Sequence, residues 1–157
     1  MLFTGLGSLG DDLVSSTRIR DLLAKGDCEK AAAMLGRTYS VVGNVVAGRG
    51  LGRQIGYPTA NVAPHHSAFP ADGIYVAEAA FNGTRHMAAV NVGYAPTLRH
   101  DERTIEAYVL DYEGDLVGVE IEVIFHKRLR GEKKFNGVDE LVKAIDEDVA
   151  KVRDYFA

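Results

Sequence analysis

A glycine-rich segment followed by a rigid turn is the most constraining feature of this 157-residue chain: residues 48–61 read GRGLGRQIGYPTAN. Its four glycines allow the backbone to adopt positive φ angles and to approach a ligand closely, and its two arginines offer positive charge to an anion. Pro58 then fixes its own φ and restricts Tyr57 to extended conformations. If the extension continues, Thr59 and Asn61 project from the same face of the chain.

The side chains of this segment suggest a site for a nucleoside triphosphate and its metal ion. A threonine hydroxyl and an asparagine carboxamide are hard oxygen ligands, and Mg²⁺ commonly takes few protein ligands and leaves room for phosphate oxygens. The residues expected to bind Mg²⁺ are Thr59 and Asn61. The residues expected to bind the nucleotide are Gly48, Gly50, Gly52, Arg53, Thr59 and Asn61. No Walker sequence follows these glycines, and from spacing alone a plain surface loop remains the alternative.

The middle of the chain shows the pattern of short strands separated by turns. Five segments favour strands by alternation or valine content: residues 39–47, 73–81, 85–92, 103–111 and 119–126. Asn82-Gly83 predicts a type I′ hairpin turn, and the glycine and proline content of residues 62–72 and 93–102 predicts loops. Short strands at regular spacing are typical of a small barrel.

Helices are predicted at both ends of the chain. Residues 18–25 follow a run of capping residues, and residues 28–35 lie between a capping Asp27 and Gly36. From residue 138 to residue 156, apolar side chains recur every three or four positions, which predicts a long C-terminal helix packed against the barrel. The expected fold class is therefore mainly β, with short N-terminal helices and a long C-terminal helix.

Composition narrows the function classes. The net charge of −4 argues against a nucleic-acid binder with a broad basic face. The single cysteine, Cys28, excludes an intramolecular disulfide and is typical of a reducing compartment. The sequence has no apolar run near the roughly 18 residues of a membrane span and no signal-peptide pattern at its start. We therefore expect a cytoplasmic protein that binds neither nucleic acid nor membrane.

The sequence GYPTAN at residues 56–61 resembles the G-x-P-T-A-N signature of riboflavin kinases, including the kinase module of bacterial FAD synthetases. In that family the threonine and asparagine bind the Mg²⁺ of MgATP, and the glycine loop folds over the phosphates. The resemblance covers residues 37–157 and implies a six-stranded antiparallel Greek-key barrel. Residues 1–36 include SSTRIR, which resembles the end of an adenylyltransferase domain. Because the H-x-G-H motif of that domain is absent, the resemblance suggests a module of a longer protein or a shortened relative.

The sequence TIEAYVL at residues 104–110 resembles the second motif of the family. In that motif a strand glutamate deprotonates the ribityl 5′-hydroxyl, so the resemblance assigns Glu106 as the general base. Tyr108 stands where the family often has histidine. The residues NVG at 91–93 resemble the loop that precedes this strand. The alternative for Glu106 is an ordinary solvent-facing strand residue, because alternation places Ile105 and Ala107 on the other face.

The sequence LRGEKKF at residues 129–135 resembles the L-R-x-E-x-K-F segment of the family, whose loop closes over the isoalloxazine ring. The resemblance implies that Arg130, Glu132 and Phe135 bind the flavin, whereas a solvated strand-to-helix connection is the alternative. The implied activity is conversion of riboflavin and ATP to FMN and ADP with Mg²⁺. A non-catalytic flavin-binding or regulatory barrel is the main rival. An oligonucleotide-binding barrel is disfavoured by the charge and by the absence of an aromatic stacking ladder.

Overall fold

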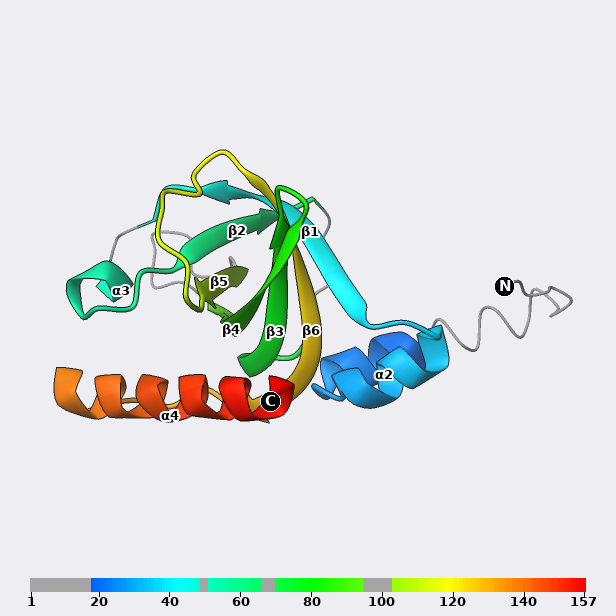
Figure 1. Ribbon diagram of the computed structural model, residues 1–157. Helices are drawn as coiled ribbons and strands as arrows, with labels where there is room; N and C mark the ends of the chain where they lie inside the picture. The colour runs from blue at the N-terminus through cyan, green and yellow to red at the C-terminus, as the bar shows by residue number, and fades with distance from the viewer. Residues whose placement is uncertain (1–17, 49–50, 66–69, 95–102) are drawn as a thin grey trace, which may run out of the picture.

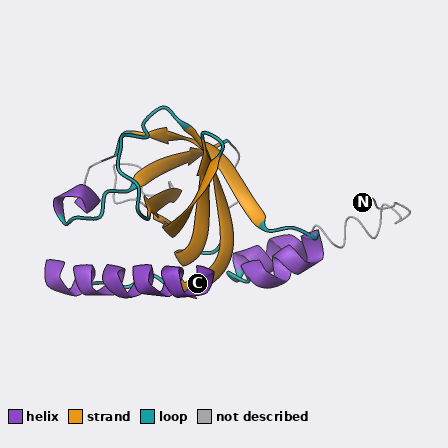
Figure 2. Ribbon diagram, in the orientation of Figure 1, coloured by secondary structure: helices purple, strands orange, loops and turns teal. Residues whose placement is uncertain are grey.

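The computed structural model describes residues 18–48, 51–65, 70–94 and 103–157 (Figure 1). Helical segments are residues 18–24, α2 (Cys28–Leu35), α3 (Leu51–Gln54) and α4 (Val138–Phe156). The strands are β1 (Tyr39–Val46), β2 (Ala60–Pro64), β3 (Gly73–Phe81), β4 (Thr84–Tyr94), β5 (Arg103–Val109) and β6 (Glu120–Arg130). Figure 2 shows the strands gathered in one body with the helices outside it. Among the described helices, none contains an apolar stretch long enough to cross a membrane.

The six strands close into an antiparallel barrel in the order β1-β2-β5-β4-β3-β6. Strands β3, β4 and β5 follow one another as neighbours, and β6 returns to pair with β3. Three consecutive strands and a fourth that returns beside the first make a Greek key. The fold class expected from the sequence is therefore confirmed.

Alternate residues of each strand fill the barrel interior. In β5, Ile105 and Ala107 are buried, whereas Glu106 and Tyr108 point outward and are partly buried. The predicted two faces of this strand are therefore confirmed. The hairpin prediction also holds, because the turn between β3 and β4 has positive φ at both Asn82 (50°) and Gly83 (77°).

The N-terminal helices pack against one end of the barrel, next to β1 and β6 (Figure 1). The Asp27 side chain accepts a hydrogen bond from the backbone N–H of Lys30 at 3.1 Å, and Gly36 ends α2 with a φ of 73°. Leu23, Cys28 and other buried residues of these helices belong to the same apolar cluster as the barrel interior. The buried side chains of residues 18–35 therefore pack against the barrel and extend its apolar core.

Helix α4 packs on the outside of the barrel against β3 and β4. Its apolar stripe forms a second cluster, in which Val76, Leu110 and Val152 are buried. Arg153 donates two hydrogen bonds to Asp111 (2.9 and 2.8 Å), and these bonds lower the pKa of that carboxyl. The helix is therefore held by one apolar face and by polar contacts beside it.

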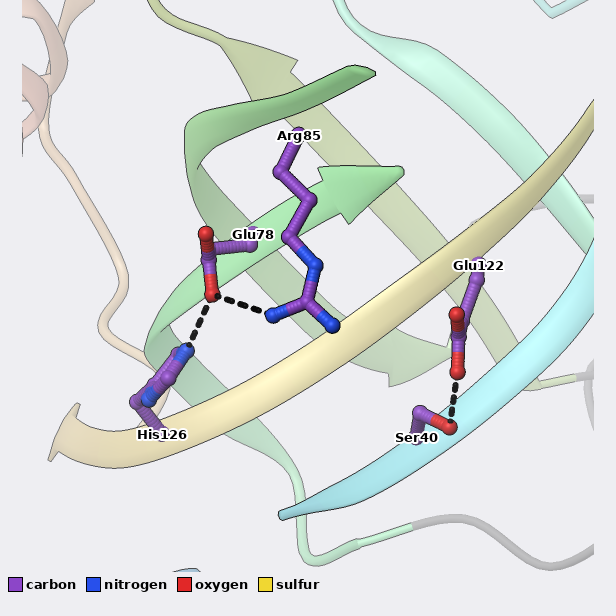
Figure 3. A network of polar contacts seen from close by, with 5 residues as sticks. All are labelled: Ser40, Glu78, Arg85, Glu122 and His126. Atoms are coloured by element: carbon purple, nitrogen blue, oxygen red, sulfur yellow. Dashed lines mark hydrogen bonds and ion pairs between the residues drawn. The ribbon is translucent and has the colours of Figure 1, made fainter. Parts of the chain in front are cut away.

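A polar network centred on Glu78 joins β3, β4 and β6 (Figure 3). His126 Nε2 lies 2.9 Å from Glu78 Oε1, and an Arg85 nitrogen lies 3.7 Å from the same oxygen. The ring of Phe156 meets the His126 ring edge-on, with centroids 5.1 Å apart. This cluster links the end of the helix to the strand beneath it.

Two strands extend further than the sequence predicted. Residues 62–64, expected in a loop, belong to β2 and pair with β1. Residues 127–130, expected in a connection, belong to β6 and pair with β3. Both predictions rested on local composition, whereas pairing with a neighbouring strand decides where a strand ends. Val138, expected in the apolar stripe of α4, is 58% exposed because it begins the helix beyond the area of contact.

Burial controls the chemistry of Cys28. The residue is 1% exposed, and burial, with a smaller contribution from Asp27, raises its pKa to about 12 from the 9.0 of a free thiol. Between pH 9 and pH 12 the thiol ionises in the unfolded chain but stays protonated in the folded one. The contribution of Cys28 to the free energy of unfolding is therefore complete below pH 9 and is lost as the pH rises toward 12. We expect urea titrations to show a larger loss of stability over this interval for the native sequence than for Cys28→Ala. Equal losses would contradict the assignment.

Candidate active site

The candidate metal ligand and the candidate base lie next to each other on the outside of the barrel. Asn61 of β2 is directly opposite Glu106 of β5, and Glu106 is directly opposite Asn91 of β4. Residues directly opposite on antiparallel strands share a face, with Cβ atoms about 4.5–5.5 Å apart. Their chain neighbours Val62 and Ile105 are buried inside the barrel, so the three polar side chains point outward.

The same line of paired residues continues across two more strands. Ile74 of β3 is opposite Asn91, and Arg130 of β6 is opposite Ile74. We call Asn61, Glu106, Asn91, Ile74 and Arg130 the outer row. It joins the candidate metal site at one end to a candidate flavin residue at the other.

Gly48 lies against the metal end of the outer row. A Cβ atom at this position would overlap the carboxamide of Asn61. The absence of a side chain therefore allows the start of the glycine loop to pass directly over Asn61.

Gly52 closes the turn that leads to Thr59. Its carbonyl accepts hydrogen bonds from the N–H groups of Ile55 (3.2 Å) and Tyr57 (2.7 Å). A Cβ atom here would overlap the Tyr57 carbonyl oxygen and would lie 3.6 Å from Thr59 Cγ2. The short helix α3, which the sequence did not predict, is thereby folded onto the chain just before Thr59.

An aromatic contact ties this turn to the strand that carries Glu106. The rings of Tyr57 and Tyr108 meet edge-on, with centroids 5.0 Å apart and an interplanar angle of 81°. Such pairs contribute about 0.5–1.5 kcal/mol beyond the burial of their area. Because Tyr108 is two residues after Glu106 on the same face, the contact holds the Thr59 segment beside the candidate base.

The candidate flavin residues lie toward the other end of the outer row. Gly93 of β4 is two residues beyond Asn91, and a Cβ atom there would overlap the carboxylate of Glu132. The Glu132 carboxylate is therefore placed beside the outer row. The guanidinium of Arg130 lies 5.9 Å from the ring centroid of Phe135.

Arg130 is also held by helix α4. It donates two hydrogen bonds to the carboxylate of Asp148, at 3.1 and 2.7 Å, and one to the carbonyl of Gly131 at 3.2 Å. The Asp148 side chain is 5% exposed and that of Arg130 is 19% exposed. This bidentate ion pair, buried on the Asp148 side and partly buried on the Arg130 side, fixes the direction of the guanidinium.

Some residues were predicted and others were missed. Gly50 lies outside the described residues, and Arg53 is exposed in the last turn of α3. Asp148 was not singled out, although an acid three residues after Ile145 and four before Val152 lies on the apolar face of the helix, where it needs a partner. Asn91 was noted only as part of a loop motif.

The donor atoms at the metal end fit a hard divalent cation. The described part of the chain contains no group of three or more His, Cys, Asp and Glu residues that could hold a metal. Thr59 and Asn61 instead offer neutral oxygens, with the Glu106 carboxylate opposite Asn61. Few protein ligands, all of them oxygen, are what Mg²⁺ uses when phosphates complete its shell.

Comparison with known proteins decides the family. The family model described as riboflavin kinase, Flavokinase, matches residues 35–156. The chain belongs to the riboflavin kinase family. The resemblance seen in the GYPTAN segment is thereby confirmed.

Similar proteins of this family are bifunctional. The chain is 38% identical over 151 residues to the bifunctional riboflavin kinase/FMN adenylyltransferase of Bacillus subtilis, covering 94% of this chain and 48% of that protein. It is 36% identical over 144 residues to the protein of the same name from Escherichia coli K12, covering 91% and 46%. This riboflavin kinase family member thus spans about half the length of the curated relatives it matches.

Solved structures share the barrel. The crystal structure described as a macrolide-efflux protein from Streptococcus pneumoniae matches with a TM-score of 0.83 and 34% identity, over 88% of this chain and 46% of that one. Riboflavin kinase from Trypanosoma brucei matches with a TM-score of 0.55 and 22% identity, over 74% and 78%. The second likeness supports the riboflavin kinase fold.

Substitution of Gly48 by alanine tests the contact with Asn61. The added methyl group must displace the Asn61 carboxamide, so we expect the Mg²⁺ concentration needed for half-maximal activity to rise about 10–100-fold, as for other supports of metal ligands. Gly137→Ala is the matched control, because a Cβ atom there meets nothing within 4 Å. An unchanged Mg²⁺ dependence in Gly48→Ala would contradict the prediction that Asn61 binds the metal ion.

Proposed function

We propose that this chain transfers the γ-phosphoryl group of MgATP to the ribityl 5′-hydroxyl of riboflavin, giving FMN and ADP. The observation that carries the proposal is the direct pairing of Asn61 with Glu106 across β2 and β5. Phosphoryl transfer requires held phosphates, a metal ion that neutralises charge and an oriented acceptor hydroxyl. The pairing brings a candidate for the second requirement next to a candidate for the third.

The nucleotide end of the site uses the glycine loop. Thr59 and Asn61 would hold Mg²⁺, and the backbone from Gly48 to Gly52 would approach the phosphates with Arg53 supplying charge. Held there, Mg²⁺ would neutralise the negative charge that develops on the phosphates. Gly48 and Gly52 serve this arrangement because neither position has room for a side chain.

Glu106 would act as the general base. Its carboxylate accepts the proton of the ribityl 5′-hydroxyl as that oxygen forms a bond to the γ-phosphorus. The bond between the γ-phosphorus and its bridging oxygen breaks, and ADP leaves. The contact between Tyr57 and Tyr108 supports this step, because it keeps the metal segment beside the strand of the base.

The flavin end would use Arg130, Glu132 and Phe135. The buried Asp148 holds the Arg130 guanidinium in one direction, so the arginine can present a fixed surface to the ring system. We also propose that residues 37–157 form the kinase domain and that residues 1–36 correspond to the end of an adenylyltransferase domain. The bifunctional names of the similar proteins and their greater length support this division.

Incubation with riboflavin and MgATP, followed by chromatography of the flavins, tests the proposal. We expect FMN and ADP in equal amounts and no product without Mg²⁺. FAD would be quantified in the same chromatography runs. Riboflavin binding without ATP consumption would instead favour a non-catalytic flavin-binding barrel. A chain that binds neither substrate would contradict both readings.

A further inference from the structure

One polar atom on the outer row is buried without a hydrogen-bond partner among the described residues. It is the Oδ1 atom of Asn91. Leaving a buried acceptor unsatisfied costs about as much as a lost hydrogen bond, so native proteins contain few such groups. Asn91 therefore carries a cost in the protein alone that a bound donor group would remove.

The position of Asn91 limits what that donor can be. β5 lies between β2 and β4, so Asn91 is on the opposite side of Glu106 from Asn61. Two residues further along β4, Gly93 lies beneath the carboxylate of Glu132. If the phosphates lie over Asn61 and the flavin ring near Glu132, the chain that joins the reacting hydroxyl to the ring crosses Asn91.

The chemistry of the atom points to the same part of the substrate. A carbonyl oxygen only accepts hydrogen bonds, and unprotonated phosphate oxygens also only accept, so they cannot satisfy it. The secondary hydroxyl groups of a polyol chain can donate. Ile74, the next residue of the outer row, is apolar and cannot compete for them.

We propose that Asn91 is a specificity-determining residue that accepts a hydrogen bond from a secondary hydroxyl of the acceptor's polyol chain, beside the hydroxyl that reacts at Glu106. The inference rests on the proposed function and extends it to the choice of acceptor. Asn91 selects a flavin that carries hydroxyls along its side chain over one that carries only a terminal hydroxyl. Sites built to bind a substrate hydroxyl discriminate strongly against an analogue that lacks it, because the polar group of the protein is then left unpaired.

Substitution of Asn91 by leucine separates this role from a structural one. Leucine is similar in size but has no polar atom, so removing an unsatisfied buried acceptor should leave the melting temperature unchanged or raise it. If Asn91 were a structural hydrogen-bonding residue, the same change would lower the melting temperature. Asn44→Leu is the comparison for an asparagine that does have a partner, because the Oδ1 atom of Asn44 lies 2.7 Å from His65 Nε2 and its loss should not raise the melting temperature.

The binding experiment compares two flavins with the native chain and the Asn91→Leu variant. One is riboflavin, and the other carries a 5-hydroxypentyl chain in place of the ribityl chain. We expect the variant to bind riboflavin about 10–100-fold more weakly, with the analogue and MgADP bound as before. Quenching of flavin fluorescence gives the dissociation constants without any need for turnover.

Equal losses for both flavins, or unchanged binding of riboflavin, would overturn the role of Asn91. A weakened affinity for MgADP alone would do the same. If the native chain binds riboflavin more tightly than the analogue in an Asn91-dependent way but forms no FMN, the kinase proposal fails while the polyol contact stands. The two ideas can therefore fail separately.

Discussion

Glu106→Gln is expected to lower kcat by about 10²–10⁴-fold while leaving the KM values for ATP and riboflavin nearly unchanged. Glutamine keeps the size and the hydrogen-bonding oxygen of the side chain but cannot take up the proton of the acceptor hydroxyl. Because Glu106 is paired with both Asn61 and Asn91, the substitution lies between the candidate metal ligand and Asn91 on the outer row. Steady-state rates of FMN formation at saturating MgATP measure the effect.

The control for this experiment is a glutamate on the same barrel. Glu120→Gln changes an exposed glutamate at the start of β6, opposite Asn44, and should leave turnover within about twofold of the native rate, as surface substitutions usually do. Titrations of both variants with riboflavin should show native affinity. Turnover of Glu106→Gln within a few-fold of the native chain would remove Glu106 from the role of base.

Asp148→Ala is expected to reduce the free energy of unfolding by about 3–5 kcal/mol, because it leaves the guanidinium of Arg130 without its buried partner. The pair joins the last residue of β6 to the middle of α4, and both carboxylate oxygens are used. Urea denaturation gives the change in stability. A loss below about 1 kcal/mol would show that the pair behaves as a surface salt bridge.

Two further variants separate the charge effect from loss of helix packing. Asp146→Ala removes an exposed acid from the same helix and should change stability by no more than about 0.5 kcal/mol. The double variant Arg130→Met with Asp148→Leu should recover much of the lost stability, since apolar side chains can replace a buried pair.

In steady-state measurements of FMN formation, Arg130→Ala should raise the KM for riboflavin more than the KM for ATP. Equal or reversed effects would contradict a role of Arg130 in binding the flavin.

Local pattern was sufficient for much of this protein. Alternation along residues 104–110 correctly predicted which side of β5 faces the interior, and Asn82-Gly83 correctly predicted the hairpin. The capping residues Asp27 and Gly36 marked the ends of α2 correctly. These features depend on the conformations that one residue and its near neighbours allow, so a single sequence contains the information. The strand ends at Pro64 and Arg130 were misjudged because they depend on a partner strand.

The sequence by itself determined which chemical groups this chain can offer. These are a glycine-rich loop, two neutral oxygen-bearing side chains, Thr59 and Asn61, after a proline, and the outward-facing Glu106 in a strand. Only the tertiary structure decided which of these groups meet. Closure of the barrel places Asn61, Glu106 and Asn91 on one row, and the packing of α4 brings Asp148 to Arg130. Backbone pattern specifies the face on which a side chain lies, whereas its neighbours across the sheet follow from strand register, which the whole barrel sets.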